Sequence, residues 1–150
     1  MISQCSNASP KSTVMNEGEG RDEIAVIFED DNMKITRTEI ELYWYYFPTT
    51  ISKIIPMADI KSIEAHKSLW FTKLWGMSLS PVWWNCDFKR FRSHAALTID
   101  TGNSILSGMT PNHGEEQTVR NVALILEQVL PGKVAMLGWE QQQPDLTNNV

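Results

Sequence analysis

Residues 40–48 read IELYWYYFP, the most strand-like stretch of this 150-residue chain. Aromatic and β-branched side chains fit a pleated sheet surface, and Pro48, which has no N–H group for the ladder, ends the strand. A period of two places four side chains on one face, Ile40, Leu42, Trp44 and Tyr46. We expect this face to fill the core, which leaves Tyr43 and Tyr45 as candidates for an exposed interaction surface.

Short apolar or alternating runs, separated by turn-forming residues, predict further strands on both sides of this stretch. Before it, the acidic turn 29–32 separates two predicted strands, 24–28 and 33–38. After it, predicted strands occupy residues 60–65, 69–75, 82–87, 94–100 and 104–109, with a tight hairpin turn at 101–103. These patterns predict a mainly β protein of about seven short strands.

The period of the apolar residues changes after residue 109 and becomes helical. Thr110 predicts an N-cap and Pro111 the first helical position. Apolar residues then recur at helical spacing, namely Val119, Val122, Ala123, Leu126, Val129 and Leu130. Pro131 and Gly132 end the predicted helix. One helix with an apolar face is suited to cap an open end of a curved antiparallel sheet.

The length of the chain suits one domain, which we assign to residues 22–131. Residues 1–21 are polar and lack periodicity, which predicts a flexible tail. Residues 132–150 are predicted as a second tail. Within it, four apolar side chains are candidates for packing back on the domain, Val134, Met136, Leu137 and Trp139.

The composition is 42% hydrophobic and 21% charged with a formal charge of −5, which is typical of a soluble globular protein. A net negative charge argues against nucleic-acid binding driven by bulk charge. The sequence contains no apolar run long enough to span a bilayer, and its first residues lack the pattern of a signal peptide. The expected location is therefore the cytoplasm.

The order of predicted elements and several short runs resemble the pleckstrin-homology (PH) superfold, in particular small PH-like proteins of the bacterial type. These runs lie at residues 45–48, 53–63, 75–76 and 108–111. The resemblance implies a bent antiparallel barrel of about seven strands capped by one C-terminal α-helix. It also implies a non-catalytic binding module, because the superfold hosts lipid, peptide and protein binders.

The distribution of charge along the chain is uneven. Residues 16–42 carry a net charge of −6, from nine acidic and three basic side chains, and residues 51–92 carry +4, from seven basic and three acidic side chains. PH domains that bind phosphoinositides usually carry Lys and Arg around the first hairpin, whereas the acidic turn 29–32 would repel phosphate. Candidate binding residues are therefore placed in the later segment, Lys73, Trp84, Lys89, Arg90 and Arg92.

Catalytic chemistry is weakly indicated. The nearest set of nucleophile and bases is Cys86, Asp87, His94, Asp100 and His113, and a catalytic Cys86 would need a neighbouring imidazole to lower its pKa. The spacing of the histidines and cysteines matches no metal site, and no phosphate-binding glycine loop is present in the sequence. We therefore expect no catalytic residue, no metal and no cofactor.

The sequence thus predicts a binding module for a protein or peptide partner. Three alternatives stay open. The first is an anionic lipid surface met by the basic segment 51–92, which implies a peripheral membrane location. The second is a homo-oligomeric structural protein built on an exposed sheet edge or aromatic patch. The third is an enzyme that uses Cys86.

Overall fold

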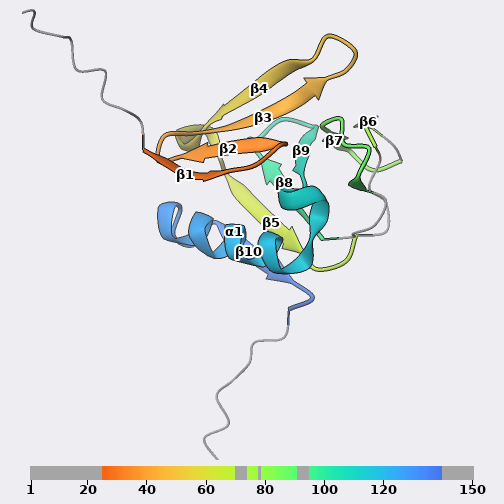
Figure 1. Cartoon of the computed structure of the whole chain (residues 1–150). Coiled ribbons are helices and arrows are strands. Elements are labelled where there is room, and N and C mark those ends of the chain that lie inside the picture. The colour runs from red at the N-terminus through yellow and green to blue at the C-terminus, as the bar shows by residue number, and fades with distance from the viewer. Residues whose placement is uncertain (1–24, 70–73, 78, 91–94, 140–150) are drawn as a thin grey trace, which may run out of the picture.

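The computed structural model describes residues 25–69, 74–77, 79–90 and 95–139, and its strands form two sheets (Figure 1). The first sheet is an antiparallel meander in the order β1-β2-β3-β4. Its strands are β1 (Val26–Glu29), β2 (Met33–Thr36), β3 (Glu39–Tyr46) and β4 (Ile51–Pro56), and η1 (Met57–Asp59) follows β4. The prediction of a mainly β protein is confirmed, although the described strands form no closed barrel.

The second sheet has the order β10-β5-β8-β9-β7-β6. At its centre, β5 (Ser62–His66), β8 (Ala96–Asp100) and β9 (Leu106–Met109) form another antiparallel meander. The edges are β10 (Val134–Leu137), which is parallel to β5, and β6 (Gly76–Met77), which pairs with β7 (Val82–Trp84) beside β9. Part of the predicted second tail is therefore a sheet strand.

The core lies between the two sheets and the helix α1 (Glu116–Val129), which packs against β5, β8 and β10. Figure 1 shows α1 running along the second sheet on the side away from the β3–β4 hairpin. Each layer contributes fully buried apolar side chains, among them Ile35, Ile40 and Leu42 from the first sheet, Ile63, Leu97 and Ile99 from the second, and Val119, Val122, Ala123 and Leu126 from α1. The helical spacing of the sequence thus predicted the buried face of α1 correctly.

The alternation of side chains predicted for residues 40–48 is wrong in its second half. Ile40 and Leu42 are buried as expected, but Trp44 is 51% exposed, Tyr46 is exposed and Tyr45 is buried. The register between β3 and β4 shifts between Leu42 and Tyr46, and Trp44 has a positive φ of 55°. Such a bulge inserts residues into one strand and exchanges the faces of every residue beyond it.

The helix begins later than Thr110 and Pro111 predicted. These residues lead into the short 3-10 helix η3 (Pro111–Gly114), and α1 starts only at Glu116. Asn112 and His113 have positive φ angles of 45° and 58°, which an α-helix cannot contain. Contacts from elsewhere in the chain hold this strained turn, because the Asn112 N–H donates to Asp30 Oδ2 at 2.7 Å and His113 contacts Asp87.

Candidate functional site

The predicted basic segment does not form one surface patch among the described residues. Trp84 is fully buried, because it is paired in register with Gly108, whose missing side chain leaves room for the indole ring. Arg90 is only 2% exposed. Lys89 is exposed, whereas Lys73 and Arg92 lie outside the described residues. Burial of Trp84 and Arg90 removes two of the five candidate binding residues of this segment from the surface.

The two tyrosines expected on an exposed surface have structural contacts instead. The Tyr45 side chain is 2% exposed, and its hydroxyl donates to Ser107 Oγ at 3.2 Å. Tyr43 is half-buried, and its hydroxyl donates to Glu29 Oε1 at 2.9 Å. The prediction for Tyr45 is therefore wrong, and the cause is the bulge at Trp44, which turns Tyr45 into the protein.

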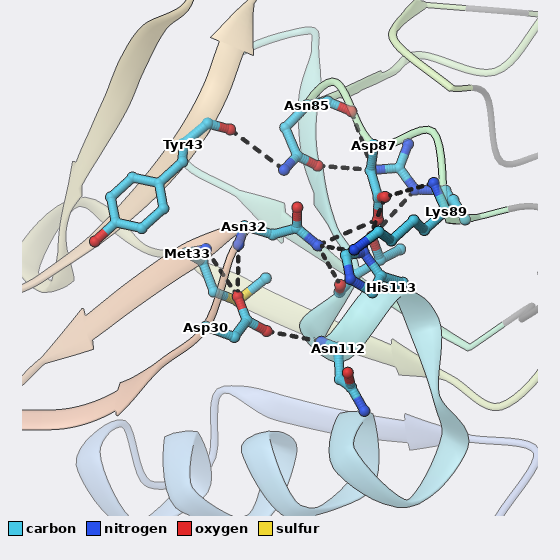
Figure 2. Close-up of polar contacts among 11 residues, drawn as sticks. Asp30, Asn32, Met33, Tyr43, Asn85, Asp87, Lys89, Asn112 and His113 are labelled. Carbon is cyan, nitrogen blue, oxygen red and sulfur yellow. Dashed lines mark hydrogen bonds and ion pairs between the residues drawn. The ribbon is translucent and has the colours of Figure 1, made fainter.

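A buried polar network surrounds Asp87 in the loop after β7 (Figure 2). Its carboxylate accepts hydrogen bonds from the Lys89 N–H at 2.9 Å and from Asn32 Nδ2 at 3.2 Å, and it contacts His113 Nδ1 at 2.9 Å. The Thr110 hydroxyl donates to it at 3.3 Å. These partners come from the β1–β2 turn, from η3 and from the residue before η3, so one carboxylate joins three segments that are distant in the sequence.

The geometry around His113 favours one tautomer. His113 Nδ1 lies 2.9 Å from Asp87 Oδ1 and 3.1 Å from Asn32 Nδ2, which is itself a donor. The charge-assisted bond to the carboxylate is the stronger of the two, so Nδ1 carries the proton, and the Asn32 amide donates to Asp87 and to the Thr110 carbonyl. The structure thus brings together Asp87 and His113 from the predicted set, while His94 lies outside the described residues.

Arg90 completes this network as a buried cation. Its Nη2 donates to the Asn85 carbonyl at 3.0 Å and to Asn85 Oδ1 at 2.7 Å, and its Nε donates to Thr110 Oγ1 at 3.1 Å. Its guanidinium group also lies 5.2 Å from the centre of the Trp84 ring. Burial lowers the pKa of Arg90 to about 10, against the negative charge of Asp87, which raises it.

Cys86 has the opposite of the environment that a nucleophilic thiol requires. Burial raises the pKa of this thiol and is the largest effect; the charge of Arg90 lowers the pKa by less, and the charge of Asp87 adds a still smaller rise. The network therefore keeps Cys86 protonated near neutral pH. Because the polar atoms of Asp87 are saturated with hydrogen bonds, the arrangement is suited to holding the loop 85–90 in place.

Three exposed aromatic side chains lie close together, one of them on this loop, and the sequence did not predict this arrangement. Phe47, Trp75 and Phe88, here called the aromatic cluster, are 47%, 40% and 59% exposed. The ring centres of Phe47 and Trp75 are 5.4 Å apart, and those of Trp75 and Phe88 are 5.8 Å apart. The three rings come from the end of β3, from the residue before β6 and from the loop after β7. Aromatic content alone gave no sign that these rings meet.

Backbone hydrogen bonds hold the segments that carry the aromatic cluster. The Asp87 N–H donates to the Leu74 carbonyl at 2.9 Å, which joins the neighbours of Phe88 and Trp75. The Cys86 N–H donates to the Trp44 carbonyl at 2.9 Å, which attaches the same loop to β3, and the side chain of Trp83 in β7 donates from Nε1 to the Tyr45 carbonyl at 3.0 Å. The rings are therefore mounted on a backbone that is fixed in several places.

The described ranges contain neither a candidate metal centre nor a candidate membrane-spanning helix. No group of three or more His, Cys, Asp or Glu side chains in those ranges is placed to hold a metal ion. No helix within these ranges is long and apolar enough to cross a bilayer.

Comparisons with protein-family models, with curated proteins and with solved structures find no match to this chain.

Proposed function

We propose that seven of the strands and α1 form a PH-like frame. The support is topological, because the meander β1 to β4 is followed by the meander β5, β8 and β9, and the helix comes after the last of these strands. In this proposal, β6 and β7 belong to an insertion between β5 and β8, and β10 is an addition after the helix. Both additions extend the second sheet at its edges.

We further propose that the protein is a non-catalytic binding module for a short apolar peptide segment of a protein partner, bound at the aromatic cluster. The observation that carries this proposal is the row of touching rings formed by Phe47, Trp75 and Phe88, each of them about half exposed. Exposed aromatic side chains grouped in this way are typical of interaction sites. Rings that already touch one another lose little conformational entropy on binding.

The charges beside the aromatic cluster favour a peptide over a membrane surface. A stable electrostatic contact with anionic lipids requires several adjacent cations, each contributing about 1 kcal/mol. Lys89, next to Phe88, is exposed, but Arg90 is buried in the network with Asn85 and Thr110 and is not available at the surface. Among the described residues, Lys89 is thus the exposed cation next to the cluster in sequence, and a peptide with aromatic or aliphatic side chains and one acidic residue complements this arrangement.

The test uses a phage-displayed library of random linear peptides, selected against the full chain. Peptides that emerge are synthesised, and their dissociation constants are measured by calorimetry with the parent protein and with the variant Trp75→Ala. Because truncation of a central aromatic residue typically costs at least about 2 kcal/mol, we expect the affinity to fall by about 30-fold or more.

The matched control is Leu124→Ala, which truncates an exposed apolar side chain on α1, away from the aromatic cluster. This variant should leave the affinity unchanged. Equal binding by Trp75→Ala and the parent would contradict the proposal. So would salt-sensitive co-sedimentation with phosphatidylserine vesicles in the absence of any selectable peptide, since that result would support the lipid alternative.

A further inference from the structure

Two adjoining hollows share no lining residue with the aromatic cluster, although Tyr46, which lines one of them, directly precedes Phe47 in the chain. The first has a volume of about 610 Å³ and lies where β4 and η1 face the β8–β9 turn, and its lining includes Asp59, Lys61 and Lys133. The second has a volume of about 410 Å³, and its lining includes Tyr46, Trp83 and Ile105. Lys53 and Asn103 line both hollows. The two hollows therefore adjoin, and together they are here called the groove. Volumes of this order suit a small molecule.

Lys53 stands at the junction of the two hollows and is incompletely neutralised. Its Nζ donates to Ser107 Oγ at 2.9 Å and lies 3.5 Å from the Tyr45 hydroxyl, both of which are neutral groups. Among the described residues, no carboxylate forms an ion pair with it. Burial lowers the pKa of Lys53, which is the expected effect on a partly desolvated cation without a counter-charge.

Two further cations give the larger hollow a positive balance. Lys61 lies against Gly102, where any side chain would collide with its ammonium group. Lys133 Nζ donates to the Ile60 carbonyl at 2.6 Å, which holds it at the groove. Within the described ranges, neither lysine forms an ion pair, and Asp59 is the one acidic residue that lines this hollow. Three lysines against one aspartate favour an anion.

The smaller hollow supplies the apolar part of the site. Trp83 and Tyr46 present aromatic surface there, and Ile105 is 42% exposed beside them. Ser107 is buried beneath Lys53, with Tyr45 and Lys53 both donating to its oxygen, so its hydroxyl supports the lysine and is not open to a substrate. The groove therefore has a cationic end and an aromatic end, and Lys53 lies between them.

We propose that this groove binds a small aromatic anion, with its carboxylate or phosphate group at Lys53 and Lys61 and its ring system against Trp83, Tyr46 and Ile105. The anion supplies the counter-charge that Lys53 lacks, and the ring covers the exposed apolar surface. This site is separate from the aromatic cluster, and the proposal does not depend on the peptide partner.

The test is a titration of the full chain with three probes of the same shape. Binding is measured by calorimetry and by the changes in backbone amide chemical shifts. The probes are 2-naphthoate, 2-naphthyl phosphate and the uncharged 2-naphthamide. Both anions should bind at least tenfold more tightly than the amide, and their shift changes should map to β4 and to the β8–β9 turn. Tight binding by only one of the two anions would still support the proposal and would identify which group the groove takes, whereas failure of both would overturn it.

Variants separate the charge from the shape of the groove. Lys53→Met keeps the aliphatic stem, and it should reduce the affinity for naphthoate to that for naphthamide, while Lys53→Arg should retain the preference for the anion. Ile105→Trp fills the smaller hollow from an exposed position and should block all three probes. Lys89→Met removes the same charge from a residue that lines neither hollow, and it should change nothing.

Several outcomes would overturn the proposal. These are equal affinities for naphthoate and naphthamide, unchanged naphthoate binding by a folded Lys53→Met variant, or shift changes centred on the aromatic cluster. The variant Trp75→Ala keeps this test independent of the proposed function, because it should weaken peptide binding and leave naphthoate binding intact.

Discussion

Trp44 shows how the backbone of one residue decides which side chains of a strand meet the core. Its φ of 55° places it in the left-handed region, which costs a residue with a Cβ roughly 1–2 kcal/mol. The resulting bulge buries Tyr45 and exposes Trp44 and Tyr46. Burial of Tyr45 in turn places its hydroxyl next to Ser107 and Lys53.

At this position we expect glycine to be more stable than alanine. The variant Trp44→Gly should exceed Trp44→Ala by about 1 kcal/mol in the free energy of unfolding, because glycine adopts a positive φ without a steric cost. Urea denaturation of the two variants measures the difference. At Tyr46, where φ is not positive, the order should reverse by roughly 0.5–1 kcal/mol, because glycine weakens a strand. Greater stability of the alanine variant at both positions would show that Trp44 is not strained.

At the scale of elements, Asp87 joins parts of the fold that have no ladder in common. The loop after β7, the β1–β2 turn and η3 all contact its carboxylate (Figure 2). Asp30 works in a similar way from the other side, since it accepts the N–H groups of Asn32, Met33 and Asn112. The acidic turn 29–32 thus supplies structural hydrogen bonds to the backbone.

Removal of the Asp87 carboxylate should strongly destabilise the protein. Asp87 is 4% exposed, forms an ion pair with His113 at 2.9 Å, and its negative charge also favours the charged form of buried Arg90. Breaking a buried charge pair on one side typically costs about 3–5 kcal/mol, so we expect this loss for Asp87→Ala in urea denaturation. The double variant Asp87→Ala with Arg90→Met should recover part of it.

The control for this prediction is Glu64→Ala, because Glu64 pairs with His66 at 3.5 Å on the surface and is about half exposed. Exposed pairs contribute about 1 kcal/mol or less, so its effect should be small. A cost below about 1 kcal/mol for Asp87→Ala would show that the network does not hold the elements together.

At the scale of the whole molecule, a small polar contact connects the two sheets. Tyr45 and Lys53 belong to β3 and β4 of the first sheet, and Ser107 belongs to β9 of the second. Their hydrogen bonds of 3.2 Å and 2.9 Å to Ser107 Oγ lie between the sheets, at the base of the groove. Burial raises the pKa of Tyr45 to about 12.

The raised pKa predicts a loss of stability at alkaline pH. The folded state favours the neutral phenol, so the stabilisation is complete below pH 10, the ordinary pKa of tyrosine, and is lost as the pH rises toward about 12. The rise in pKa from 10 to about 12 corresponds to about 3 kcal/mol at most. Tyr45→Phe should lack this decline when the free energy of unfolding is measured against pH.

The comparison with the parent protein isolates Tyr45 from its neighbours. The lowered pKa of Lys53 acts in the opposite direction, because the folded state releases that proton first, but both proteins contain Lys53. Both proteins also contain the more exposed Tyr43, so its raised pKa does not affect the comparison. Parallel stability curves for the parent and Tyr45→Phe between pH 10 and 12 would contradict the prediction.

Local chemistry in the sequence determined the mainly β character, the approximate positions of most strands and the buried face of α1. The spacing of apolar residues and the positions of turn-forming residues were sufficient for these features, because both depend on only a few neighbouring residues. Val119, Val122 and Leu126 illustrate this, since their spacing places them on one side of any α-helix.

Tertiary structure alone decided what the strand at residues 40–48 presents to solvent, and it decided both proposed sites. The bulge at Trp44 and the strained turn at His113 are held by contacts with residues 83–87, which no local pattern contains. Arg90 was a surface cation by residue type, but Asn85 and Thr110 provide hydrogen bonds that allow its burial. The aromatic cluster and the groove likewise join residues from separate elements, because packing brings side chains together without regard to their distance in the sequence.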